Sequence, residues 1–160
     1  MEFGILTVKH KRIQAVGALF LSINTNRFLF ALRADDTYSG TWSTIGGRTE
    51  PGETVIASLE REIREEIGFL PLVRKTVPID LFVSADQRFE FHTFVCVVDR
   101  EFVPQLNHEH NGYAWTELDG YPKPLHPALY NALRVPELKE KLEQLLQLVK
   151  NSSEELSFFS

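Results

Sequence analysis

The sequence lacks most of the features that would place a protein outside the cell or in a membrane. It contains one cysteine, Cys96, in 160 residues, so it cannot form an internal disulfide, and a reducing compartment fits that composition. No apolar run is long enough to span a bilayer. Residues 1–4 lack the basic and apolar regions of a secretory signal. We therefore expect a cytoplasmic protein that does not contact membranes.

An excess of positive charge is also missing. The formal net charge is -5, which argues against non-specific binding to a nucleic-acid backbone, because such binding needs a basic face. The sequence has no Gly-rich loop of the P-loop type and no dinucleotide fingerprint. Small phosphorylated ligands stay compatible with an acidic protein, since they need only a few local cations or a bound metal.

The hydrophobic pattern mixes strand and helix signals in one domain. The composition, 43% hydrophobic and 24% charged, is ordinary for a globular protein. The strands form hairpin-like pairs, which predicts an α/β fold with a central mixed sheet covered by helices. We expect a single domain over residues 1–150 and a loose tail over residues 151–160. The expected strands are 13–23, 27–33, 77–85, 88–99 and 113–117, the expected helices are 54–67 and 136–150, and the segment 121–127 is expected to be irregular.

Three glutamates crowd the end of the expected helix over residues 54–67. Glu62, Glu65 and Glu66 are spaced so that they share one arc beside the apolar face. Like charges at this spacing repel, and the helix dipole also disfavours anions in the last turn. A hard divalent cation such as Mg²⁺ or Mn²⁺ would resolve that conflict, because it prefers carboxylate oxygens. The alternative is a solvated acidic helix face.

The segment before this helix favours the metal interpretation. Gly46 and Gly47 let the backbone approach a ligand closely, and a glycine carbonyl can join a metal shell. Glu53 lies at the start of the helix, where it can brace Arg61. Arg61 itself is expected on another flank of the helix, so that the patch of three carboxylates stays open.

These residues match the signature of the Nudix hydrolase family. The signature reads G-x5-E-x7-R-E-U-x-E-E-x-G-U, in which U is an apolar residue, and the segment 47–69 meets every specified position. The resemblance implies the Nudix fold, an α/β/α sandwich, over about residues 5–150. One departure lies outside the signature, where Ile45 stands at a position that is proline in many relatives.

The resemblance implies a role for each matched residue. Mg²⁺ or Mn²⁺ would be bound by four residues of the signature, namely Gly47 through its carbonyl, Glu62, Glu65 and Glu66. Arg61 belongs to the catalytic set with these glutamates. Together with Glu53 it would hold the loop and the helix together. Gly68 would end the helix. Family members cleave a nucleoside diphosphate linked to another moiety, by attack of a metal-activated water on phosphorus. The general base stays open between a signature glutamate and one on a later loop.

Four residues outside the signature are candidates for catalysis or substrate binding. Glu109 follows the last long strand, where relatives often supply an extra glutamate as metal ligand or base, although an exposed turn residue is the alternative. Arg33 ends a strand, where relatives often place an arginine against phosphates, and a surface salt bridge is its alternative. Trp42 and Tyr113 could stack on a base, but packing is the simpler role for both.

Three functions are compatible with the signature. The first is an active pyrophosphohydrolase whose substrate is a nucleoside triphosphate or a nucleotide-sugar, and the intact glutamates favour it. The second is a non-catalytic sensor of the Nudix fold that binds a nucleotide without cutting it. The third is a diphosphate isomerase, which needs a positioned cysteine, whereas Cys96 lies in an apolar run that favours burial. Relatives are often dimers, so a homodimer is also compatible with the sequence.

Overall fold

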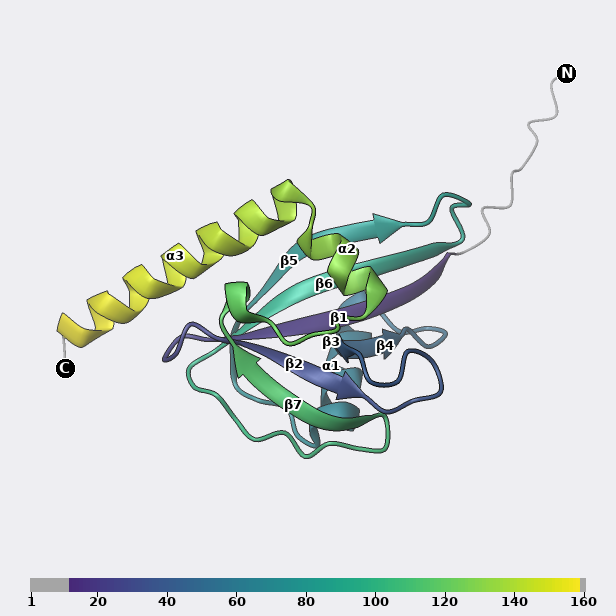
Figure 1. The fold of residues 1–160 in the computed structure, drawn as a ribbon, viewed down its shortest axis with the longest axis horizontal. Coiled ribbons are helices and arrows are strands. Elements are labelled where there is room, and N and C mark those ends of the chain that lie inside the picture. Colours follow the sequence, from purple (N-terminus) through teal and green to yellow (C-terminus); the bar gives the residue numbers. More distant parts are fainter. Residues whose placement is uncertain (1–11, 159–160) are drawn as a thin grey trace, which may run out of the picture.

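Two long strands pair in parallel at the centre of the sheet (Figure 1). The computed structural model describes residues 12–158. The other strand pairs in this part of the chain are antiparallel, so the sheet is mixed, as predicted. The path through the sheet is β3 (Trp42–Ser43), β2 (Phe28–Arg33), β1 (Ile13–Ser22), β6 (Phe89–Val98) and β5 (Val73–Val83), while β4 (Ile45–Arg48) pairs with β1 and β7 (His110–Thr116) pairs with β2. The helices are α1 (Val55–Ile67), the short 3-10 helix η1 (Leu118–Gly120), α2 (Pro127–Leu133) and α3 (Pro136–Phe158).

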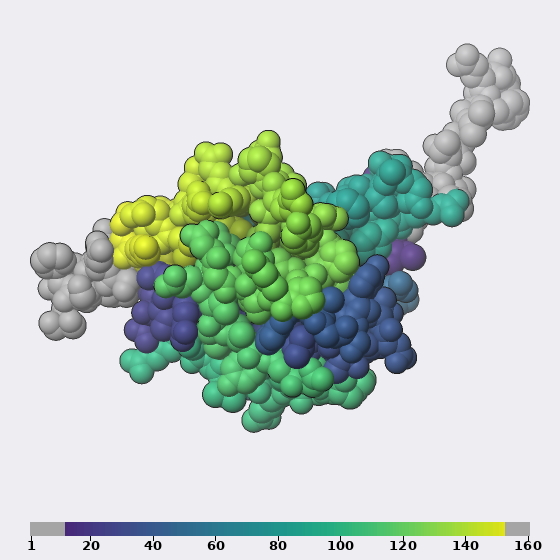
Figure 2. Space-filling view, viewed as in Figure 1, coloured from purple at the N-terminus to yellow at the C-terminus, as the bar shows by residue number. Residues whose placement is uncertain are grey.

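Alternate residues of β1 face two separate hydrophobic layers, as the two-residue period of a strand requires. Val16 and Phe20 pack in a core cluster with Ile63 of α1. Leu19 and Leu21 pack in a second cluster on the side of α3. In Figure 1, α1 lies behind the sheet and α2 crosses in front of it, and Figure 2 shows α2 and α3 over the upper part of the front face. The expected α/β/α sandwich is therefore confirmed.

Local signals fix both ends of α1. The hydroxyl of Thr54 accepts a hydrogen bond of 3.1 Å from the N–H of Ala57, which caps the start of the helix. Gly68 ends the helix with a φ of 88°, a left-handed conformation that favours glycine. The start and end of this helix therefore agree with the sequence prediction.

The strands β3 and β4, the helix α2 and the 3-10 helix η1 were not predicted. The strands β3 and β4 are too short to give a periodic signal in the sequence. The helix α2 begins at Pro127, where a proline fits the first turn because its missing N–H needs no partner there. In addition, β5 begins at Val73, before the expected start at residue 77. It passes Pro78 at a shift of register, which an edge strand tolerates.

The C-terminal helix is longer than expected. α3 continues to Phe158, so residues 151–158 are helical and the prediction of a loose tail is wrong for them. Residues 1–11 and 159–160, where the expected start of the domain and the end of the expected tail fall, lie outside the described residues. Over residues 12–158, no helix combines the length and the apolar character that crossing a membrane requires.

The close approach of β4 to β1 depends on glycine. Gly46 lies opposite Gly17 in the strand pair. A Cβ atom added to Gly46 would lie 1.9 Å from the carbonyl oxygen of Val16, far inside any permitted contact. Since that oxygen belongs to the central strand, it cannot move without disturbing the sheet.

We predict that Gly46→Ala lowers the free energy of unfolding by about 3 kcal/mol, because the added methyl group overpacks the sheet. Chemical denaturation of the purified protein measures this change. Gly120→Ala is the matched control, since a Cβ atom there meets nothing within 4 Å. Equal stability of the two variants would contradict the pairing of β1 with β4.

Candidate metal and catalytic site

Two buried glutamates of α1 face the backbone of β4. The N–H of Gly46 donates a hydrogen bond of 2.7 Å to Oε2 of Glu66. Glu62 lies over Gly47, where an added Cβ atom would come within 2.5 Å of Oε1. The exposed fraction is 8% for Glu62 and 2% for Glu66. The bare backbone of Gly47 therefore makes room for Glu62, and the N–H of Gly46 holds Glu66.

Arg61 ties the segment before α1 to the helix. It donates two hydrogen bonds to Glu53, of 2.8 and 3.0 Å, and one of 2.9 Å to the carbonyl of Arg48. It also donates to Glu62 over 3.0 Å and to Glu65 over 3.2 Å. The contact with Glu53 is the one expected from the sequence, but the expectation that Arg61 lies on another flank is wrong. Held by Glu53, its guanidinium covers part of the carboxylate patch.

Glu65 lies at the rim of the site. Its side chain is 53% exposed, and Arg61 is its hydrogen-bond partner. The three signature glutamates therefore do not form one open patch, because Glu62 and Glu66 are enclosed and Glu65 faces solvent. This position leaves Glu65 accessible to a ligand that arrives from solution.

A later loop brings Glu109 to the buried carboxylates. One oxygen each of Glu66 and Glu109 and one ring nitrogen of His110 lie within 4.8 Å of one another. Asn107 anchors this loop, because its Nδ2 donates to the carbonyl of Glu65 over 3.0 Å and its Oδ1 accepts the N–H of Glu109 over 2.9 Å. The sequence analysis missed Asn107, although an asparagine that bonds the backbone two residues later is a known turn signal.

Arg33 lies on the same face of the sheet. The pair of β2 and β7 places Arg33 opposite His110 after a shift of register. Its side chain donates to both carboxylate oxygens of Asp35, a residue that the sequence analysis did not single out. The contact with Asp35 and the charges of Glu66 and Glu109 raise the pKa of Arg33, so the guanidinium keeps its positive charge beside the carboxylates.

Burial makes negative charge costly at this site. Burial, followed by the neighbouring carboxyl groups of Glu109 and Glu62, raises the pKa of Glu66 to about 10. Burial also raises the pKa of Glu62, although Arg61 opposes that shift. A divalent cation among these oxygens would remove the cost, and carboxylate and carbonyl oxygens such as that of Gly47 are the ligands that Mg²⁺ and Mn²⁺ take. The donor set therefore fits such a cation.

The structure brings Tyr113, but not Trp42, to the face of the carboxylates. Tyr113 is 39% exposed and pairs with Ala31, which belongs to the core cluster on the α1 side. Trp42 pairs with Leu32 and packs against the core cluster on the α3 side. Packing is therefore the role of Trp42 that the contacts show.

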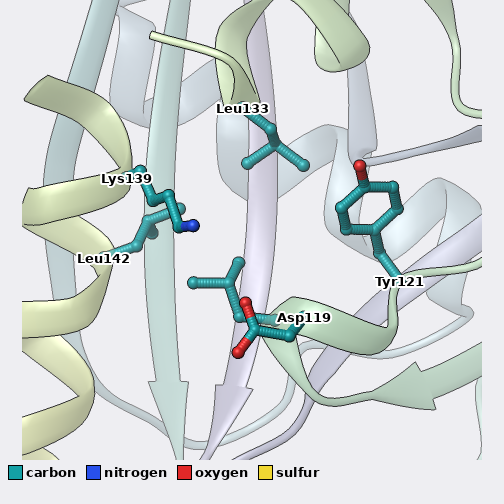
Figure 3. Close-up of a pocket in the computed structure, with 6 residues that line it drawn as sticks. Asp119, Tyr121, Leu133, Lys139 and Leu142 are labelled. Atoms are coloured by element: carbon teal, nitrogen blue, oxygen red, sulfur yellow. The ribbon is translucent and has the colours of Figure 1, made fainter. Parts of the chain in front are cut away.

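A cavity of about 240 Å³ lies on the opposite face of the sheet (Figure 3). It opens between α3, α2 and the segment that follows β7. The lining residues are Leu118, Asp119, Tyr121, Leu133, Lys139 and Leu142. Leu142 belongs to the core cluster on the α3 side, so the sheet separates this cavity from the carboxylates of α1.

Comparisons with known proteins agree with this geometry. The model of the NUDIX domain family matches residues 11–135. The nucleoside triphosphatase NudI of Escherichia coli O17:K52:H18 is 36% identical over 107 residues, which cover 59% of this chain and 75% of that protein.

Solved structures share the fold. The MutT NUDIX hydrolase from Burkholderia pseudomallei superposes with a TM-score of 0.61 at 21% identity, over 81% of this chain and 98% of that one. The NUDIX domain of Shewanella oneidensis NrtR, complexed with ADP ribose, gives a TM-score of 0.64 at 14% identity, over 83% and 90% of the two chains. Together with the signature and the family match, these findings show that the chain belongs to the Nudix hydrolase family of enzymes, which act on phosphoanhydride bonds.

Proposed function

We propose that the protein is a divalent-metal-dependent pyrophosphohydrolase of a nucleoside triphosphate. The observation that carries this proposal is the enclosure of Glu62 and Glu66 against Gly46 and Gly47, with Glu109 beside them. The substrate class rests on the similarity to NudI, which is described as a nucleoside triphosphatase. A nucleotide-sugar, which the sequence also predicts, is the second substrate class to test.

The cation, Mg²⁺ or Mn²⁺, would be held by Glu62, Glu66, Glu109 and the carbonyl of Gly47, with Glu65 at the rim as a further ligand. When bound, it would lower the pKa of a water and offset negative charge on the phosphates. The base that would accept a proton from the attacking water is either Glu65 of the signature or Glu109 of the later loop. Arg61 is a positioning residue in this scheme, since it fixes the loop and two of the glutamates.

Arg33 is the residue that we propose for binding a substrate phosphate. Asp35 accepts from Nε and Nη2 of Arg33, while Nη1 has no hydrogen-bond partner among residues 12–158. A guanidinium group fixed in this way presents directed N–H groups to phosphate oxygens. Tyr113, exposed on the same face, is the aromatic residue that we propose for contact with the base.

The other functions that the sequence left open have less support. Burial raises the pKa of the Cys96 thiol to about 12, so this cysteine is a poor candidate for the chemistry of an isomerase. A sensor that does not cut its ligand has no need for the enclosed carboxylates. The cytoplasmic location, the homodimer and the single domain over residues 1–150 stay predictions of the sequence.

We predict that hydrolysis of nucleoside triphosphates requires Mg²⁺ or Mn²⁺ and stops with EDTA. Glu66→Gln should lower kcat about a hundredfold, because an amide cannot offset the charge of a cation. Mass spectrometry of products from a panel of nucleoside triphosphates and nucleotide-sugars, in ¹⁸O water, would identify the substrate and the phosphorus attacked. Glu60→Gln, which removes an exposed charge from the same helix, is the control and should leave turnover unchanged. Turnover in EDTA, or full activity of Glu66→Gln, would refute the proposal.

Asn107→Ala should lower kcat about tenfold with little change in KM, since Glu109 loses its anchor while Arg33 is untouched. Asn107→Asp should recover part of the loss, because its carboxylate still accepts the N–H of Glu109. Steady-state kinetics with the substrate found above measures both effects. Asn111→Ala removes an exposed asparagine nearby and should match the wild type. A change in stability alone, without a change in kcat, would contradict the positioning role.

The metal-free protein should lose stability as pH rises from about 5 towards 9. Glu66 has a pKa of about 10 in the folded protein and an ordinary value of 4.5, so the folded state holds its proton more tightly than the unfolded chain. Its contribution is complete below the ordinary pKa and falls above it by at most about 1.4 kcal/mol per pH unit. Glu66→Gln should flatten this dependence, and Mg²⁺ should raise the Tm of the wild type most at high pH. If the stability of the two proteins in EDTA depends on pH in the same way, Glu66 is not the cause of the loss of stability.

A further inference from the structure

His110 is a buried histidine to which the proposed reaction assigns no role. Its exposed fraction is 7%, and its Nδ1 is enclosed without a hydrogen-bond partner among the described residues. Buried polar atoms are almost always paired with protein, water or an ion, so an unpaired ring nitrogen requires an explanation. His110 is the first residue of β7 and directly follows Glu109 in the chain.

The arrangement around His110 has nearly the dimensions of a metal shell. One ring nitrogen of His110 and one oxygen each of Glu66 and Glu109 lie within 4.8 Å of one another. In an octahedral shell with bonds of about 2.1 Å, opposite ligands lie about 4.2 Å apart. Small side-chain movements would therefore bring all three atoms onto one cation. The nearby positive charge of Arg33 does not prevent this, since Asp35 is paired with it.

We infer that His110 supplies an imidazole nitrogen to the cation site of Glu66 and Glu109, and that the site consequently prefers first-row transition cations, such as Mn²⁺, to Mg²⁺. The inference rests on the proposed function, because it requires a cation between these carboxylates. Mg²⁺ binds oxygen ligands and keeps several waters, whereas imidazole is a good ligand for transition cations. A site built from oxygens alone would not make this distinction.

The alternative is a packed histidine that touches no cation, and His108 provides an internal contrast. His108 lies two residues earlier on the same loop, is exposed, and is absent from the cluster of ligand atoms among the described residues. Removing His108 changes the histidine content as much as removing His110 does. It should nevertheless leave the cation site intact.

The test is pulsed electron paramagnetic resonance on the full chain loaded with Mn²⁺ alone, without substrate. We expect echo modulation from a directly bound imidazole ¹⁴N, replaced by a ¹⁵N pattern when the protein is grown with ¹⁵N-histidine. His110→Ala and His110→Gln should lose this signal, and His108→Ala should keep it. Calorimetric titration should show that His110→Ala weakens Mn²⁺ binding about tenfold or more, with a change of less than about threefold for Mg²⁺.

Each outcome separates this inference from the proposed function. Bound Mn²⁺ without nitrogen coupling in the wild type, or coupling that persists in a folded His110 variant, would overturn the role of His110. If nucleoside triphosphate hydrolysis is still metal-dependent in that case, the proposed function stands. Failure of the wild type to bind Mn²⁺ would overturn both, whereas failure to hydrolyse the panel with the nitrogen coupling present would overturn the proposed function alone. The isotope experiment needs no substitution, so a variant that fails to fold does not decide the question.

Discussion

The whole site depends on the burial of two carboxylates beside the backbone of two glycines. Glu62 can be buried in this way because Gly47 carries no side chain, as the distances to an added Cβ atom show, and Glu66 is held by the N–H of Gly46. Burying carboxyl groups is costly, and burial raises the pKa of both side chains. The two hydrophobic layers packed on opposite sides of β1 offset that penalty. The sandwich therefore supplies the stability that lets a buried acidic cluster persist.

The same constraint explains why distant segments meet at α1. Carboxylates that are to share a cation must be held at fixed separations, and two anchors do this from different sides. Arg61 joins the helix to the loop before it through Glu53. Asn107 joins the C-terminal end of the helix to the loop that carries Glu109. Because Arg61 also bonds the carbonyl of Arg48, and both bonds of Asn107 go to backbone groups, the geometry depends on the loops being folded and not only on the presence of the glutamates.

The helix and its glutamates could be predicted because their signals are local. The 3.6-residue period, the cap at Thr54 and the terminal Gly68 all lie within one short segment. The hydrogen bond from Asn107 to the carbonyl of Glu65 joins residues 42 positions apart, and no local sequence pattern predicts such a contact. The parallel pairing of β1 with β6 is hidden for the same reason. The expected position of Arg61 was wrong because helical spacing gives only the direction in which a side chain leaves the helix. The guanidinium at the end of a long side chain can turn toward a partner such as Glu53.

A single irregularity in the sheet decides which side chains of β7 join the site. Tyr113 lies opposite Ala31, but the register then shifts so that His110, and not Asn111, lies opposite Arg33. Side chains alternate between the two faces of a strand, so regular pairing would have turned Asn111 toward α1 and His110 toward the other layer. The extra residue reverses that alternation, as a β-bulge does. The side chain of His110 therefore lies on the same face of the sheet as the carboxylates, and Glu109 is its neighbour in the chain. The composition of the site thus depends on a one-residue insertion in strand pairing as much as on the signature in α1.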